Sequence, residues 1–460
     1  MHKSLQKRMK EEGYTHLSID LFSGPGGICT GFKWGGILPL IAVEWVETTS
    51  KTYAISHNAD IFELDKYFED KNYLEKFLKE SSKTLLIRGD INLVENDLIC
   101  QILEFRFGIN SIDETIDIVS GGAPCESFSM AGKRLANDKR DDLFSNILRI
   151  SRIVNSKMVL FENVKGIFSK SKDGVKGAIF DYICNSFEDK SFCPNYVLAS
   201  RNQEEILLKA CDYGVPQVRE RLFLVGIRSD LKTKFNYPKK EYGPNRKYPY
   251  VTVSDALADL PIVLSGEETT TYKCLEKYSN QIQESYISLI RGYDFDKKIN
   301  SKTPKYLLEK GYFTESKISC HKGPGHVKKK QELLAIIPEK ETMKSVFDKL
   351  TKDGTIDKYR HLFPRVIYGS RNRRLLNNEP SFTVTSHCLD EILHPTLNRA
   401  ITPREAARLQ SFPDWYQFEG PYVQFHGAKE QDKYEQIGDA VPPLLAYALA
   451  KEVVKTLDRI

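Results

Sequence analysis

The sequence predicts an α/β fold in which a doubly wound, mostly parallel sheet is joined to a second, smaller domain. Three observations lead to this prediction. Short apolar runs alternate with helical patterns in the first half of the chain, which is typical of parallel βαβ units. This rhythm stops after about residue 228, where lysine, tyrosine, proline and glycine become frequent. The chain has 460 residues, enough for two domains.

The first βαβ unit is the clearest. Residues 16–22 predict a strand, residues 23–27 a glycine-rich turn, and residues 28–33 the start of a helix. Further strands are expected at 38–44, 84–87, 116–119, 158–161, 196–199 and 221–227, and further helices at 46–57 and 142–154. Regular structure returns at Thr402, a natural N-cap, and a last helix is expected at 444–457.

The composition excludes several classes of protein. No apolar run approaches the length of a membrane span, and the charged N-terminus does not resemble a signal peptide, so we expect the protein in the cytoplasm where it is made. The nine cysteines are scattered without a Cys-x-x-Cys pair. This argues against a disulfide framework and a zinc site, and we expect no metal.

The charge is unevenly distributed. The net charge is +5, but residues 227–380 contain 30 Lys and Arg against 19 Asp and Glu, an excess of +11 that leaves −6 for the remainder. A basic middle segment indicates a polyanionic partner, with nucleic acid as the first candidate. A solvated lysine-rich surface would give the same numbers, so charge alone leaves both interpretations open.

Cys125 stands in Gly-Gly-Ala-Pro-Cys, directly after the apolar run 116–119. In open α/β sheets, ligands bind outside the carboxyl ends of the strands, so a thiol there is a candidate nucleophile. A buried structural cysteine is the alternative. Three more reactive side chains are expected at the same edge. Glu162 ends a strand, and Arg219 and Arg221 lie two positions apart in an extended segment and so point the same way.

The glycine-rich turn at 23–27 predicts a nucleotide-binding corner, because glycines let the backbone approach a ligand at a helix N-terminus. Glu44 ends the next strand and could accept hydrogen bonds from a ribose, while Trp45 could cover an adenine and Asp90 could bind its edge. Nicotinamide, flavin, S-adenosylmethionine or no ligand all remain possible for such a turn. The full Gly-x-Gly-x-x-Gly spacing is missing, which argues against a dinucleotide.

Together these segments resemble the bacterial-type DNA (cytosine-5)-methyltransferases. The matching segments follow the family's order and cover about 1–227 and 380–460: Asp20-Leu-Phe-Ser-Gly-x-Gly-Gly27, Glu44-Trp45, Gly89-Asp-Ile91, Pro124-Cys125, Glu162-Asn-Val164, Gln217-x-Arg-x-Arg221, Arg404-Glu-Ala-x-Arg-Leu-Gln-x-Phe-Pro413 and Gly438-x-Ala-Val-Pro442.

The resemblance implies a Rossmann-like methyltransferase sheet and three functional segments: a catalytic domain at 1–227, a target-recognition domain at 228–425, and a segment at 426–460 that returns to the catalytic domain. It implies methylation of C5 of a flipped cytosine in double-stranded DNA, with S-adenosylmethionine as cofactor, S-adenosylhomocysteine as product and no metal. It also implies a monomer in a restriction–modification system, with a restriction endonuclease as functional partner.

The resemblance assigns roles to the reactive side chains. Cys125 would attack C6 of cytosine, Glu162 would bond N3 and the exocyclic amine, Arg219 would help to hold the base, and Arg221 would orient Glu162 or a phosphate. Pro124 and Asn163 complete the two catalytic motifs. The implied cofactor residues are Phe22, Ser23, Gly24, Gly26, Gly27, Glu44, Trp45, Asp90, Ile91, Leu143, Asp439, Ala440 and Val441.

The stretch 126–140 resembles the family's loop that closes over the flipped base, and the basic middle segment would read the target. The expected DNA contacts are Ser127, Ser129, Lys133, Arg134, Gln217, Arg371, Arg373 and Arg374. The chain departs from the family at two positions, with Glu126 in place of the usual Gln and Asp439 in place of Asn. An RNA (tRNA) cytosine-5 methyltransferase and a non-catalytic DNA-binding regulator remain as alternatives.

Overall fold

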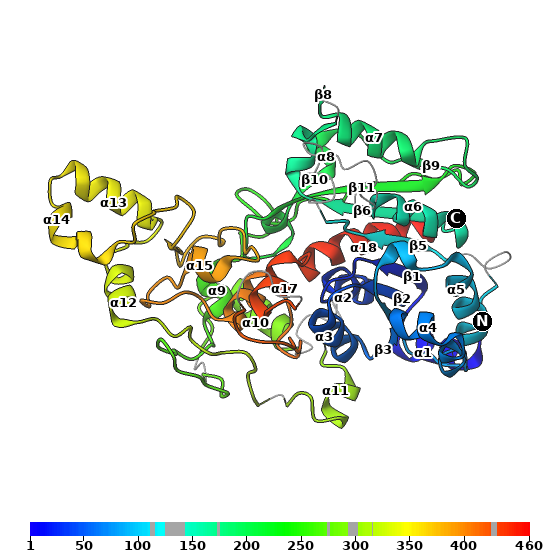
Figure 1. Ribbon diagram of the computed structural model, residues 1–460, viewed down its shortest axis with the longest axis horizontal. Helices are drawn as coiled ribbons and strands as arrows, with labels where there is room; N and C mark the ends of the chain where they lie inside the picture. Colours follow the sequence, from blue (N-terminus) through cyan, green and yellow to red (C-terminus); the bar gives the residue numbers. More distant parts are fainter. Residues whose placement is uncertain are drawn as a thin grey trace. The chain divides into compact units, whose positions relative to one another are not determined.

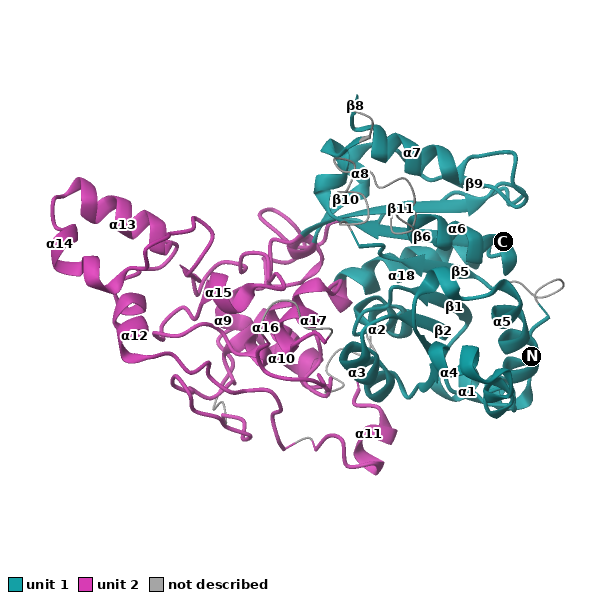
Figure 2. Ribbon diagram, viewed as in Figure 1, with its two compact units in different colours: residues 1–209, 220–239, 445–460 teal, residues 210–219, 240–444 magenta. Residues whose placement is uncertain are grey.

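The computed structural model describes residues 1–110, 116–124, 143–172, 175–273, 277–292, 302–314, 316–424 and 430–460. The chain forms two compact units, shown in different colours in Figure 2. Unit 1 contains residues 1–209, 220–239 and 445–460, and unit 2 contains residues 210–219 and 240–444. These bounds differ from those of the predicted functional segments, and the functions of those segments remain predictions.

Unit 1 is built on one large sheet (Figure 1). Its strands are β1 (His16–Leu21), β2 (Ile37–Glu44), β3 (Asp60–Glu63), β4 (Leu85–Arg88), β5 (Ile118–Gly121), β6 (Met158–Asn163), β9 (Tyr196–Leu198), β10 (Leu207–Lys209) and β11 (Glu220–Arg228). They lie in the order β10-β11-β6-β5-β1-β2-β4-β3, with β9 also paired to β11. Strands β1 to β6 pair in parallel, and β11 runs antiparallel to its neighbours. The predicted α/β class with a mostly parallel sheet is therefore confirmed.

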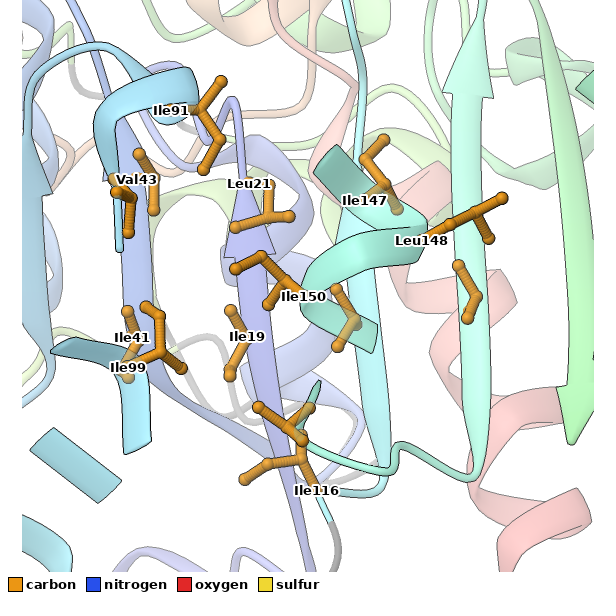
Figure 3. Close-up of a cluster of buried hydrophobic side chains, with 14 of the residues drawn as sticks. Ile19, Leu21, Ile41, Val43, Ile91, Ile99, Ile116, Ile147, Leu148 and Ile150 are labelled. Carbon is orange, nitrogen blue, oxygen red and sulfur yellow. The ribbon is translucent and has the colours of Figure 1, made fainter. Parts of the chain in front are cut away.

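Helices cover this sheet because its strands are apolar on both faces. The helices of unit 1 are α1 (Lys3–Glu12), α2 (Gly27–Trp34), α3 (Glu47–His57), α4 (Leu64–Glu69), α5 (Asn96–Gln101), α6 (Leu143–Ile153), α7 (Ala178–Phe187), α8 (Gln203–Ile206) and most of α18 (Pro443–Leu457). Helix α6 places an apolar stripe on the sheet, since Phe144, Ile147 and Ile150 are fully buried. Figure 3 shows part of this core: Ile19, Leu21, Ile41, Val43, Ile91, Ile99, Ile116, Ile147, Leu148 and Ile150.

Unit 2 consists mainly of short helices and connecting segments. Its helices are α9 (Val253–Leu257), α10 (Gln281–Arg291), α11 (Lys305–Glu309), α12 (Lys328–Ala335), α13 (Met343–Lys352), α14 (Ile356–Tyr359), α15 (Cys388–Glu391), α16 (Pro403–Leu409) and α17 (Lys433–Asp439). Two short strands, β12 (Arg373–Arg374) and β13 (Ile392–Leu393), pair in parallel. Among the helices of the described ranges, none has the length and apolar character needed to span a membrane.

Helix α16 lies at the centre of unit 2, with every one of its residues buried. Thr402 caps its N-terminus and forms a capping box with Glu405. Glu405 also receives two hydrogen bonds from the buried Arg399, at 2.8 and 2.7 Å. On the same helix, the guanidinium of Arg408 pairs with Asp414 and Asp259. Buried ion pairs therefore surround α16, while a separate apolar cluster forms around Leu334 of α12 and the neighbouring Ile337.

Candidate active site

The carboxyl ends of the parallel strands β1, β2 and β4 are joined by backbone hydrogen bonds. The amide of Ser23, just after β1, donates to the carbonyl of Val43 at 3.0 Å. The amide of Gly89, just after β4, donates to the carbonyl of Glu44 at 3.0 Å. The segments that follow these strands thus lie together at one edge of unit 1, the edge at which open α/β sheets bind ligands.

The glycine-rich turn has a backbone that few other residues adopt. Gly26 has a φ of 101°, and Phe22 is held at a φ of 55°, in the left-handed region that a phenylalanine rarely occupies. Gly27 then begins helix α2, so the amides of its first turn face out over the edge. Strain of this kind is concentrated at ligand sites. The predicted cofactor residues in 22–27 therefore form a tight turn with left-handed backbone conformations, directly before the N-terminus of α2.

Glu44 ties this turn to the next helix. One of its carboxylate oxygens accepts from the amide of Gly24 at 2.9 Å, and the other accepts from the amides of Trp45 and Val46 at 2.8 and 2.9 Å. These three hydrogen bonds fix the carboxylate of Glu44 between the glycine-rich turn and the start of helix α3. Trp45 follows with 65% of its side chain exposed, as a ring that covers a ligand would be before binding.

The remaining predicted cofactor residues fall into both units. In unit 1, Asp90 caps the short helix Ile91–Leu93 by accepting from the amide of Asn92 at 2.9 Å. Ile91 is buried, and Leu143 packs against the same core. In unit 2, Asp439 ends α17 with an exposed side chain, and Ala440 and Val441 are buried after it. That all of these residues line one pocket remains a prediction.

Among the predicted catalytic residues, Glu162 and Arg221 form an ion pair. The register of β6 and β11 places Phe223 opposite Glu162, so Arg221 projects on the same face two residues away. The Arg221 Nε lies 3.0 Å from a carboxylate oxygen of Glu162, and both side chains are mostly buried. A Cβ at Gly122 would lie 2.5 Å from the other carboxylate oxygen. Glu162 is therefore fixed by an arginine and by the space that Gly122 leaves open.

Asn163 positions the segment that leads to Cys125. Its side-chain amide donates to the carbonyl of Ala123 at 3.1 Å, and its side-chain oxygen accepts from the amide of Val164 at 2.8 Å. Pro124 is exposed at the end of this segment. Cys125 lies outside the described residues, as do Glu126, Ser127, Ser129, Lys133 and Arg134. The described segment nevertheless ends one residue before the predicted nucleophile.

Arg219 and Gln217 lie within unit 2 and are fully buried. Arg219 donates to the carbonyl of Val384 at 2.7 Å. Gln217 accepts from the amide of Val384 and donates to the carbonyl of Leu409 and the side chain of Gln410, at 2.8 to 3.0 Å. These internal hydrogen bonds occupy the side-chain amide of Gln217, so its geometry indicates a structural role within unit 2. Its predicted contact with DNA remains a prediction.

The three predicted arginine contacts of the middle segment differ. Arg374 is wrong as a DNA contact: its side chain is buried, and its five N–H groups donate to Leu334, Ile337, His394, Leu397 and Asn398. Arg373 stacks its guanidinium on Phe382, 3.4 Å from the ring centre. Arg371 remains 44% exposed, 3.5 Å from Asp390. Arg371 and Arg373 remain predictions as DNA contacts.

Two features at the edge carry roles that the sequence prediction did not assign. Gly122 was expected only as part of a strand end, yet it makes room for Glu162. Asp20 is buried beneath the glycine-rich turn and bonded to Ser120 and Cys29. A signal for Asp20 was present, since an acidic residue stands within an otherwise apolar strand.

Comparison with known proteins agrees with this geometry. The family model for C-5 cytosine-specific DNA methylases matches residues 17–455. The Type II methyltransferase M.DdeI of Desulfomicrobium norvegicum is 29% identical over 445 residues, covering 95% of this chain and 88% of the relative. The Type II methyltransferase M.XorII of Xanthomonas oryzae pv. oryzae is 29% identical over 444 residues, covering 96% and 85%.

A solved Escherichia coli structure, described as a prophage-encoded DNA modification methyltransferase, has a TM-score of 0.64 and 24% identity, covers 96% of this chain and 100% of that chain, and supports the fold alone. The resemblance to cytosine-5 methyltransferases is confirmed, and with it the activity on cytosine in DNA. The family and fold also imply S-adenosylmethionine as the methyl source. The chain belongs to the C-5 cytosine-specific DNA methylase family.

Proposed function

We propose that the chain methylates C5 of a flipped cytosine through a covalent bond between Cys125 and C6. The observation that carries the proposal is the placement of Glu162. Its carboxyl group is held by Arg221 at 3.0 Å, above Gly122, on the strand whose next residue fixes Ala123. A carboxyl group fixed beside the segment leading to a thiol can bind a ring while the thiol attacks it.

The chain's own residues would perform four tasks. The Cys125 thiolate adds to C6, and the electron pair moves to C5, which becomes a carbon nucleophile. Glu162 hydrogen-bonds N3 and the exocyclic amine and stabilises the charge that develops on the ring. A base at the site removes the C5 proton after methylation. Expulsion of the Cys125 thiolate then restores the aromatic ring. None of these steps requires a metal ion.

The glycine-rich turn and Glu44 fit the proposed cofactor, since the turn presents backbone amides at a helix N-terminus and Glu44 places a carboxylate beside them. When bound, S-adenosylmethionine supplies a methyl group on a sulfonium and leaves as S-adenosylhomocysteine. Trp45 would cover the adenine and Asp90 would bind its edge. Asp439, with an exposed carboxylate where the family usually has an amide, would face the amino acid end.

We further propose the division of labour between the units. Unit 1 would hold the chemistry, and the basic part of unit 2, with Arg371 and Arg373, would contact double-stranded DNA. We also propose that the chain is a monomer that acts beside a restriction endonuclease in the bacterial cytoplasm. The relatives' designation as Type II methyltransferases supports the restriction–modification part of this proposal.

Covalent trapping tests the role of Cys125. A duplex carrying 5-fluorocytosine should accept the methyl group yet keep the enzyme attached, because fluorine cannot leave C5 as a proton does. We expect a complex that survives denaturing gel electrophoresis with the wild type and with Cys193→Ser, which alters an exposed cysteine. We expect none with Cys125→Ser. An adduct with Cys125→Ser would refute the proposed nucleophile.

The choice of substrate is tested separately. Bisulfite sequencing of genomic DNA treated with the enzyme should locate the methylated cytosines within one short sequence motif. Transfer to tRNA in preference to duplex DNA would contradict the proposed use of the basic segment. Binding of S-adenosylmethionine without transfer of its methyl group to DNA or tRNA would favour the alternative of a non-catalytic DNA-binding regulator.

A further inference from the structure

Asp20 is a buried acidic group of unit 1 that the proposed chemistry does not use. It lies near the end of β1, opposite Ala42 of β2 and Ser120 of β5, two residues before the glycine-rich turn. Only 1% of the residue is exposed to solvent. A carboxylate at such a place needs partners, because burial strongly disfavours its charged form.

The two hydrogen-bond partners of Asp20 among the described residues are neutral. One carboxylate oxygen accepts from the Ser120 hydroxyl at 2.6 Å, and the other accepts from the Cys29 thiol at 3.0 Å. The Cys29 sulfur lies 3.1 Å from the Tyr53 hydroxyl in turn. Within the described ranges, Asp20 has no lysine, arginine or histidine at ion-pair distance, whereas Asp117, at the other end of β5, pairs with Lys157 at 2.7 Å.

Glu44 adds a second negative group at the same edge. It lies close enough to Asp20 to raise the pKa of Asp20 further, after burial, while the hydrogen bonds from Cys29 and Ser120 act in the opposite direction. The net result is a pKa of about 6 for Asp20. Asp20 is thus ionised above this pH, beneath the turn that would hold the cofactor, and no cationic side chain of the described residues lies at ion-pair distance from it.

We propose that the buried charge of Asp20 favours the cationic cofactor over its neutral-sulfur product. S-adenosylmethionine carries a positive sulfonium that S-adenosylhomocysteine lacks, and the two molecules are otherwise alike. A carboxylate buried among neutral donors gains more from a nearby cation than a hydrated carboxylate does. Asp20 would therefore strengthen binding of the methyl donor relative to the spent product. This inference rests on the proposed cofactor site.

Calorimetric binding of the two ligands to the whole chain at pH 8 tests the proposal. Asp20→Asn removes the charge and keeps one acceptor oxygen, while its NH2 group faces the other partner, Ser120 or Cys29, which must then accept instead of donate. We expect it to weaken S-adenosylmethionine by about tenfold or more, as an opposite charge at close range usually does, and to leave S-adenosylhomocysteine within about twofold. Retained binding of S-adenosylhomocysteine also shows that the variant is folded. Equal weakening of both ligands, or of neither, would overturn the proposal.

Cys29→Ala and Ser120→Ala are the matched controls, because each removes a neutral donor and keeps the charge of Asp20. We expect both to preserve the ratio of the two affinities at pH 8. If the wild type binds neither ligand, the proposed cofactor site itself fails. If the wild type binds both but Asp20→Asn leaves their ratio unchanged, only the role of Asp20 fails.

The wild type offers a second test that needs no variant. The affinity for S-adenosylmethionine should rise as the pH increases through about 6, where Asp20 ionises, and that for S-adenosylhomocysteine should not follow it. The other titratable groups facing this region are Glu44, Cys29, Lys33, Tyr53 and His57. Any slope that persists in Asp20→Asn belongs to them. An identical pH profile for both ligands in the wild type would contradict the proposal.

Discussion

The interiors of the two units differ in the kinds of side chain that they bury. In unit 1, strands such as β2 are apolar on both faces and are covered by helices. In unit 2, the central helix α16 is surrounded by buried charges, including Arg399, Glu405, Arg408 and Asp414. An apolar interior tolerates the loss of one contact by partial relaxation. The ion pairs around α16 do not, because removing one partner leaves the other charged and dry. Unit 2 also contains an apolar cluster around Leu334 and Ile337, so this fragility is confined to the surroundings of α16. The comparison predicts where each unit is fragile.

The largest effect is expected from Arg408→Ala. It removes the common partner of Asp259 and Asp414 and leaves two buried carboxylates without it. We expect a loss of about 3–5 kcal/mol in the stability of unit 2. Hydrogen exchange, measured separately for peptides of the two units, would check this. Ile147→Val in unit 1 is the contrasting variant and should cost about 1 kcal/mol. Similar losses of stability in the two variants would show that the ion pairs around α16 are no more sensitive to substitution than the apolar core of unit 1.

Acid should destabilise unit 2 through His394, and the buried His57, whose pKa burial lowers well below its usual value, makes unit 1 acid-sensitive in the same direction. Burial lowers the pKa of His394 to about 4, and its Nδ1 accepts from the amides of Thr396 and Leu397. The unfolded chain therefore binds a proton below about pH 6.5 that the folded chain resists. Stability falls as the pH decreases from 6.5 towards 4, by about 3 kcal/mol for this group.

Thermal unfolding followed between pH 7.5 and 4.5 measures this effect. His394→Asn keeps an acceptor near the Nδ1 position and cannot titrate. We expect a flatter pH dependence in this variant. An unchanged slope would assign the acid sensitivity to other groups, of which His321 and His326 also have a lowered pKa through burial.

Gly122→Ala tests a steric constraint in unit 1, where the position of Glu162 depends on the space beside Gly122. The new Cβ would lie 2.5 Å from a carboxylate oxygen of Glu162 and displace it. We expect kcat to fall by about 10²-fold, as it does when a catalytic group is misplaced by about an ångström. Unfolding temperature and cofactor affinity should change little. Normal kcat in this variant would show that Glu162 need not be held in this place.

The smallest effect is expected from Thr402→Ala, which removes the N-cap of α16 and leaves the ion pairs intact. A capping threonine contributes about 1 kcal/mol. Chemical denaturation should detect a loss of this size. A loss as large as that of Arg408→Ala would show that the cap, through Glu405, controls the whole network.

The sequence predicted unit 1 well because its strands are long apolar runs with helices between them. The strands β3 and β10 were missed, since Asp60–Glu63 and Leu207–Lys209 are short and mix polar with apolar residues. In unit 2, periodicity gave little guidance, because its helices are short and partly held by charges. Counting charge could not separate Arg371, which is exposed, from Arg374, which is buried with all its donors bonded.

The site divides in the same way. Residues that stand at strand ends, such as Glu44 and Glu162, were predictable, because topology brings the carboxyl ends of parallel strands to one edge. The role of Gly122 was not, because it depends on a packing distance that spacing along the chain does not contain. Asp20 left a signal, as an acidic residue in an apolar strand, but its partners Ser120 and Cys29 follow only from packing. The arrangement of Gln217 around Val384 and Gln410 likewise joins segments far apart in sequence.

That last arrangement has a consequence for protein engineering. Unit 2 consists of one long insertion, 240–444, and the short piece 210–219, which carries Gln217 and Arg219. An exchange of recognition modules between relatives would naturally cut at the long insertion alone. Such a hybrid would leave Gln217 and Arg219 facing a foreign Val384 segment. Modules of this architecture should therefore be transplanted as two pieces, with the ten-residue strip moved together with the large one.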